Sequence, residues 1–273
     1  MTDLPADDFS IPARLGVGAR VHNGEFQLTL EPFPALLHHD VLRISAMTFL
    51  VDVIAGVVMD SDPDRWLLTT DLTVRSLAGV AAPGLIATTQ VLRQGRRSST
   101  CHVEVVAADG STQAVGAVAF AQVPLRPNDP PKHILPLDEV AELFDTSLRI
   151  DGPLRDVAGI EVLDAAAGVV QIDVTSAVRN PAGTMQGAMV ALVVEAAVEE
   201  MVEKSLGGPV AVVDLDLRYL ATTSDGPVRS SCRWLGPSEQ GSVEVRLTDL
   251  STGALTTLAY ARAVDVAGPA PGG

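Results

Sequence analysis

The chain has 273 residues, of which 47% are hydrophobic and 19% are charged, a balance that excludes disorder over most of its length. Lysine and arginine number 19 against 34 aspartate and glutamate residues, and the net charge of −15 disfavours binding to nucleic acid. No apolar run approaches the ~18 residues that a membrane-spanning helix needs. The acidic first residues do not resemble a secretory signal, and the isolated Cys101 and Cys232 fit a reducing compartment. We expect a cytoplasmic protein that binds neither nucleic acid nor a membrane.

The same series of elements is predicted twice along the chain. After a tail (residues 1–14), a strand of alternating character at 24–31 precedes a helix that we expect to run from Asp40, a good N-cap, to residue 58. Strands are predicted next at 66–77, 84–94, 98–107 and 113–123. The second series has a strand at 168–175, a helix between Thr184 and Gly207, and strands at 210–221, 226–235, 242–249 and 254–264.

Local sequence similarities support this repetition. Residues 71–75 match residues 214–218, and residues 45–52 match residues 188–195, both at an offset of 143. Further matches occur in the same order at offsets between 140 and 144. We therefore predict two tandem domains, at 15–123 and 155–265, joined by a linker over 124–154 that can hold a short helix and followed by a tail at 266–273.

Both predicted helices are apolar around nearly their whole circumference, which is typical of buried helices. Asp52 is the sole acidic residue between Val41 and Val58 in the first of them. One buried helix wrapped by one antiparallel sheet is the hotdog arrangement, an α+β fold. We predict two tandem hotdog domains that form a pseudo-dimer, with their sheets paired edge to edge into one continuous sheet.

The segment from residue 180 to residue 195 resembles the signature of hotdog-fold acyl-CoA thioesterases of the phenylacetate-pathway type. That signature reads Asn-x-x-Gly-x-x-His-Gly-Gly, followed by an apolar helix with one acidic residue. The positions that agree with it are Asn180, Gly183, Gly187 and Glu195, while Gln186 stands in place of the histidine. In the first copy, Leu37 takes the place of the asparagine, Asp40 that of the first glycine and Ile44 that of the glycine that follows the histidine. The resemblance implies hydrolysis of acyl-CoA thioesters at sites shared between the two halves, with no cofactor other than the coenzyme A of the substrate.

The residue types suit this chemistry. The free N–H groups and positive dipole end of a helix N-terminus can stabilise a developing oxyanion, and Gly187 would let a thioester approach the backbone. Asn180 can donate from its amide, and a carboxylate can act as nucleophile or general base. Glu195 lies eight residues past Gly187, roughly 12 Å along the helix, which is too far to act at its own helix start.

The two helices of a hotdog pair lie side by side and antiparallel, so each carboxylate faces the start of the other helix. We therefore predict a competent site that combines Asp52 of the first half with residues of the second half. These are Asn180, Gln186 and Gly187, and Gly183 is assigned to substrate binding in the same loop.

Glu195 is expected to face a degenerate site around His38, His39 and Asp40, in which the histidines are candidate substrate-binding residues. A loop histidine opposite an acidic residue is also the catalytic pair of hotdog hydratases and dehydratases. Hydration or dehydration of an acyl thioester is therefore an alternative function. Adjacent histidines point in different directions and lack helical metal-ligand spacing, so no metal site is predicted.

Each candidate has a structural alternative. Asp52 could pair with Arg43, and Glu195 could belong to a solvated stripe with the glutamates that follow it. Arg75 and Arg218 occupy equivalent strand positions and could hold the phosphates of coenzyme A, or they could be ordinary outward strand charges. Because a fold does not fix a function, a non-catalytic acyl-ligand binding protein stays open. We also expect a homo-oligomer of double-hotdog units.

Overall fold

The computed structural model describes residues 10–77, 79, 81–125 and 132–266. Residues 1–9 of the predicted first tail, residues 126–131 of the predicted linker and residues 267–273 of the predicted second tail lie outside the described residues. Within the predicted tail at 1–14, Ile11–Arg14 form a 3-10 helix in which Ile11 is buried.

The predicted elements occur in the predicted order, with further short elements among them. The first part of the chain contains β1 (Val17–His22), β2 (Glu25–Leu30), β3 (Leu37–His38), β4 (Val41–Leu42), α1 (Ile44–Met59), β5 (Arg65–Ser76), β6 (Leu85–Gln94), β7 (Ser98–Val106) and β8 (Thr112–Pro124). The linker region contributes α2 (Leu137–Ala141) and α3 (Leu154–Val157). The remainder contains β9 (Glu161–Asp164), β10 (Val169–Ile172), α4 (Gly187–Leu206), β11 (Val210–Tyr219), β12 (Val228–Trp234), β13 (Ser242–Asp249) and β14 (Ala254–Asp265).

Twelve of these strands form one antiparallel sheet in the order β1-β2-β6-β7-β8-β5-β11-β14-β13-β12-β10-β9. The two halves of the sheet meet at β5 and β11, which pair antiparallel with Leu72 opposite Leu217. The predicted continuous sheet is therefore confirmed. The edge strands β1 and β9 were not predicted. β9 is a short strand with all four residues exposed, so burial imposes no apolar pattern on it.

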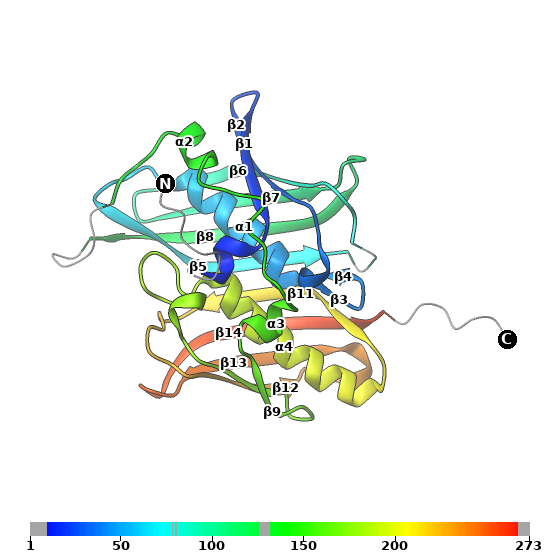
Figure 1. Ribbon diagram of the computed structural model, residues 1–273. Coiled ribbons are helices and arrows are strands. Elements are labelled where there is room, and N and C mark those ends of the chain that lie inside the picture. The colour runs from blue at the N-terminus through cyan, green and yellow to red at the C-terminus, as the bar shows by residue number, and fades with distance from the viewer. Residues whose placement is uncertain (1–9, 78, 80, 126–131, 267–273) are drawn as a thin grey trace.

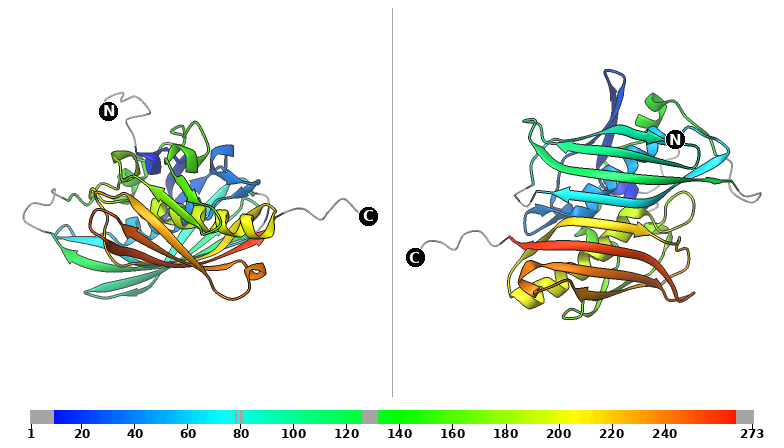
Figure 2. Two further views of the ribbon diagram at one scale, coloured as in Figure 1. Left: turned by 90° about the horizontal axis from the view of Figure 1, so that it is seen from below. Right: turned by 180° about the vertical axis from the view of Figure 1, so that it is seen from behind.

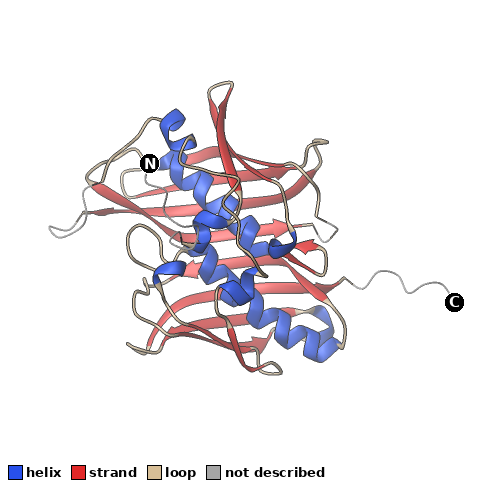
Figure 3. Cartoon of the chain, viewed as in Figure 1, coloured by secondary structure: helices blue, strands red, loops and turns tan. Residues whose placement is uncertain are grey.

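Helices α1 and α4 lie side by side on one face of the curved sheet (Figures 1 and 3). The view from below shows the sheet wrapped around them (Figure 2). The strands bury alternate residues against the helices, among them Leu72 and Val74 on β5 and Leu215 and Leu217 on β11. None of the helices in the described part of the chain is long and apolar enough to cross a membrane.

Helix α1 begins at Ile44 rather than at the predicted Asp40. His39 and Asp40 have positive φ angles of 48° and 62°, which a right-handed helix excludes. They form the turn of a small hairpin in which Leu37 pairs with Leu42. The predicted N-cap is therefore a turn residue, and aspartate is one of the residue types that tolerate this conformation.

Candidate active site

A cavity of about 810 Å³ opens beside the first turn of α4. Its lining includes Asp52 of α1 and Gly187 of α4. It also includes apolar residues, among them Val53 and Val57 of α1, and Val140 and Phe144 of the linker region. A mostly apolar cavity lined by some polar groups is the usual form of a small-molecule site.

The start of α4 is fixed by Gln186 and Gly187. Gln186 is the N-cap residue, and its side-chain oxygen accepts a 2.5 Å hydrogen bond from the backbone N–H of Ala188. The first N–H groups of a helix have no partner within the helix. Among the described residues, no acceptor bonds the N–H of Gly187. A backbone donor without such a partner thus stands at the positive end of the α4 dipole, on a residue that lines the cavity.

Asp52 projects from the middle of α1 toward this helix start. A Cβ atom placed on Gly187 would lie 2.8 Å from Oδ2 of Asp52, so only a glycine leaves room for the carboxylate. The hydroxyl of Thr69 donates a 2.7 Å hydrogen bond to Oδ1. Burial raises the pKa of Asp52 to about 6, and the Thr69 bond opposes that rise. The carboxylate is therefore ionised at neutral pH but takes up a proton readily.

Tyr219 completes this group and, like Thr69, was not predicted from the sequence. Its hydroxyl donates a 3.2 Å hydrogen bond to the carbonyl oxygen of Gly187 and would lie 3.1 Å from the same hypothetical Cβ atom. Burial and the Asp52 charge raise its pKa well above the usual value, so the phenol keeps its proton. The sequence feature that could have indicated Tyr219 is its position directly after segment 214–218, which matches segment 71–75 of the first half.

The position of Thr69 depends on a local irregularity of the sheet. The pairing of β5 with β8 shifts register between Thr69 and Asp71. Such an irregularity changes the direction in which side chains point. Here two consecutive residues, Thr69 and Thr70, both line the cavity. Sequence alternation gives no signal for this shift.

The loop before α4 is a tight turn built around Asn180. Its side-chain oxygen accepts a 3.1 Å hydrogen bond from the backbone N–H of Thr184, and its amide nitrogen donates to the Thr184 hydroxyl at 3.0 Å. Gly183 has φ +80°, which glycine adopts without strain. Asn180 and Gln186 both line the cavity. Their hydrogen-bonding groups hold the loop and the helix cap, which in turn place Gly187.

The start of α1 has a different arrangement. The carboxylate of Glu195, 1% exposed, accepts hydrogen bonds from the N–H of Ile44 at 2.8 Å and from the hydroxyl of Ser45 at 2.5 Å. Arg43 lies 3.7 Å from Glu195 and donates to both oxygens of Glu199 at 2.9 and 3.0 Å. Burial and the adjacent Glu195 carboxylate raise the pKa of Glu199. Arg43 thus pairs with these glutamates and not with Asp52.

Glu195 does not meet the two histidines as predicted. The Nε2 atoms of His38 and His39 lie 3.0 and 2.9 Å from Oε1 of Glu203 instead. Burial and the Arg43 guanidinium lower the pKa of His38 to about 4. Neither histidine lines the cavity beside Gly187.

Arg75 and Arg218 also lie away from the cavity. They point to the face of the sheet opposite the helices, because the intervening residues of their strands are buried against α1 and α4. Arg75 forms ion pairs with Asp214 and Asp216, and Arg218 pairs with Asp71 at 3.1 Å. They are cross-strand pairs that bridge the two halves of the sheet.

A scan of protein-family models and a search of curated proteins give no match. Solved structures do match. An acyl-ACP thioesterase from Bacteroides thetaiotaomicron VPI-5482 is 11% identical with a TM-score of 0.60, over 96% of this chain and 100% of that one. The 12:0-ACP thioesterase from Umbellularia californica is 15% identical with a TM-score of 0.59, and the match covers 90% of this chain and 99% of that one.

A conserved protein from Alicyclobacillus acidocaldarius described as having a hot dog fold is 12% identical with a TM-score of 0.56, over 94% of this chain and 98% of that one. At these identities the likeness concerns the fold. The chain is an α+β protein with the hotdog fold, as predicted, and the similarity extends over nearly its whole length.

Proposed function

We propose that the protein hydrolyses acyl-CoA thioesters in the cavity between α1 and α4, with Asp52 as general base. The observation that carries the proposal is the approach of the Asp52 carboxylate to Gly187, the first residue of α4, where both residues line a mostly apolar cavity. The acyl chain would occupy the apolar part, and the thioester carbonyl would lie against Gly187. The two groups come from different halves of the chain, so the site is shared between them.

The reaction follows from this placement. The Gly187 N–H and the α4 dipole would polarise the carbonyl and stabilise the oxyanion that forms on it. Asp52 would accept a proton from a water molecule as its oxygen attacks the carbonyl carbon. When the C–S bond breaks, the same proton passes to the departing thiolate, and the products are a carboxylic acid and a free thiol. Thr69 would hold the carboxylate in the orientation that this transfer requires.

The similar structures support the reaction class, since two of them are named as thioesterases of acyl-ACP substrates. Coenzyme A as the carrier, kinship with the phenylacetate-pathway type and a cytoplasmic location are parts of the proposal that rest on the sequence. The geometry does not favour a hydratase, because His38 and His39 contact Glu203 outside the cavity.

We also propose that the two halves arose by tandem duplication of one hotdog unit. The strand order is mirrored about the β5–β11 pair, and Asp40 and Gly183, aligned in the sequence, both have positive φ angles.

Association of this double unit into a homo-oligomer is a further prediction. Light scattering at micromolar concentration would refute it by giving the monomer mass of 28.5 kDa.

The test is the release of free thiol from a panel of acyl-CoA and acyl-ACP thioesters. Asp52→Asn keeps the size of the side chain and should lower the rate by on the order of 10²-fold or more, with KM nearly unchanged. Glu195→Gln is the matched control, since it neutralises the equivalent carboxylate of the other half, and it should cost much less.

Three results would contradict the proposal. Full activity of Asp52→Asn would show that the carboxylate is structural. Loss of activity only in Glu195→Gln would move the site to the start of α1. Binding of acyl thioesters without any thiol release by the unmodified protein would identify a non-catalytic acyl-ligand protein.

A further inference from the structure

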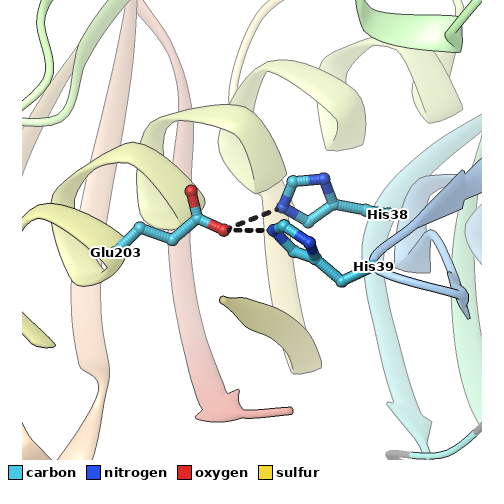
Figure 4. Close-up of side chains that lie close together, drawn as sticks. All are labelled: His38, His39 and Glu203. Carbon is cyan, nitrogen blue, oxygen red and sulfur yellow. Dashed lines mark hydrogen bonds and ion pairs between the residues drawn. The ribbon is translucent and has the colours of Figure 1, made fainter. Parts of the chain in front are cut away.

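Two histidines and a glutamate meet at the far end of α4, outside the proposed active site (Figure 4). His38 and His39 come from the β3–β4 hairpin of the first half, and Glu203 comes from α4 of the second half. Both Nε2 atoms lie within 3.0 Å of the same oxygen, Oε1 of Glu203. The three atoms all lie within 4.8 Å of one another.

Neighbouring residues of a strand point to opposite sides, so this convergence needs a special backbone. It arises because the chain turns sharply directly after His38. His39 has φ +48° and Asp40 has φ +62°, and the two imidazole rings lie with their centroids 4.1 Å apart. The expectation that adjacent histidines diverge is therefore wrong at this position.

We propose that Nε2 of His38, Nε2 of His39 and Oε1 of Glu203 bind a divalent transition-metal ion, with zinc as the best match. Zinc binds imidazole nitrogen at about 2.0–2.1 Å and carboxylate oxygen at about 2.0–2.2 Å, so tetrahedral ligand atoms lie roughly 3.3 Å apart. The nitrogen–oxygen distances of 3.0 and 2.9 Å are close to that spacing. Two imidazoles and one carboxylate are a common zinc ligand set, which leaves a fourth position for water. The 42% exposure of the His39 side chain gives solvent access to that position.

The charges around the cluster also favour a cation. Arg43 pairs with Glu195 and Glu199. Among the described residues, no lysine or arginine pairs with Glu203, whose ion-pair partners are His38 and His39. The backbone N–H of Val210 donates to Oε1 of Glu203 at 3.3 Å, which orients the ligand oxygen.

One contact has to change when the metal binds. Nη2 of Arg43 lies 3.3 Å from Nδ1 of His38. A metal on Nε2 places the remaining ring proton on Nδ1, so this contact is lost. Because the site has only three protein ligands and loses the Arg43–His38 contact, it should bind zinc more weakly than a closed four-ligand zinc site.

The position of the cluster indicates a structural role. Glu203 lies sixteen residues after Gly187, roughly 24 Å along α4, so the metal would not reach the proposed catalytic groups. It would instead connect the hairpin of one half with the helix of the other. Because such an ion binds the folded state and not the unfolded one, it should stabilise the association of the two halves.

The experiment uses untagged full-length protein that has been dialysed against a chelator and then titrated with zinc chloride in a calorimeter. We expect one equivalent of zinc to bind, and His39→Asn and Glu203→Gln each to weaken binding at least tenfold. His22→Asn is the matched control, since it removes an exposed histidine of the β1–β2 hairpin, and it should leave binding unchanged. Zinc should raise the melting temperature of the unmodified protein and of His22→Asn, but not of Glu203→Gln.

A second measurement needs no variant. In protein labelled with ¹⁵N at its five histidines, zinc should shift the ring nitrogen resonances of two of them, with Nε2 as the ligated atom. Absence of saturable zinc uptake, or shifts confined to other histidines, would overturn the proposal. Binding that is equally strong in His39→Asn and Glu203→Gln would overturn it as well.

Discussion

Glu195 of α4 accepts a 2.8 Å hydrogen bond from the backbone N–H of Ile44, the first residue of α1. The equivalent relationship at the other end of the helix pair joins Asp52 to Gly187, and there the carboxylate leaves the backbone donor free. Aspartate is one methylene shorter than glutamate. The longer side chain fills the helix start of α1 with the protein's own carboxylate, whereas at the start of α4 no described acceptor bonds the Gly187 N–H.

The pH dependence of thioester hydrolysis should report on Asp52. A general base acts only when it is ionised, and burial raises the pKa of this carboxyl group to about 6. We expect kcat/KM to fall as the pH is lowered through about 6 and to be level above it. The measurement is the rate of thiol release across this range. A profile that stays flat down to pH 4 would exclude Asp52 as the base.

Asp52→Asn, which the proposed mechanism expects to lower activity, should stabilise the protein. The folded-state pKa of Asp52, about 6, is above the ordinary value of 3.8, so folding favours the protonated form. The stability that this proton contributes is present below pH 3.8 and is lost as the pH rises through 6. Asp52→Asn should therefore raise the melting temperature at pH 8 and change it little at pH 3.5. Equal shifts at both pH values would show that the gain does not come from the charge.

A methyl group at residue 187 should block the site without unfolding the protein. The Cβ atom of Gly187→Ala would lie 2.8 Å from Oδ2 of Asp52 and 3.1 Å from the hydroxyl of Tyr219. Displacement of a catalytic group by about 1 Å can cost on the order of 10²-fold in rate. Steady-state kinetics of Gly187→Ala should show such a loss, while Gly208→Ala, which meets no atom within 4 Å, should behave like the unmodified protein.

Arg43 should be essential for stability. Its side chain is 4% exposed, and its guanidinium pairs with Glu195 and Glu199 in the interface between the halves. Removal of one partner of a buried ion pair typically costs about 3–5 kcal/mol, because the remaining charge loses its compensation. Urea unfolding of Arg43→Met should show a loss of that size. Adding Glu199→Met should recover part of it, and no recovery would mean that packing rather than charge dominates.

The sequence was sufficient for ten of the twelve strands of the large sheet and for the presence of the two buried helices, because apolar periodicity and turn residues recur in both halves. It also placed Asp52 and Gly187 together, since antiparallel helices bring each mid-helix acid to the other helix start. Thr69 could not be found this way, because its orientation depends on a register shift in β5. The meeting of His38 with Glu203 was missed for a similar reason, since it depends on positive φ angles that no local pattern encodes.

If the proposed site is correct, the central pairing of β5 with β11 links activity to the folding of both halves. The proposed base lies on one half and the proposed oxyanion donor on the other, and this strand pair joins the two halves of the sheet. An isolated half would keep a helix and a sheet but would lack one of these two groups. In a denaturant titration, activity and ellipticity should therefore disappear in a single shared transition, with no active intermediate in which only one half is folded.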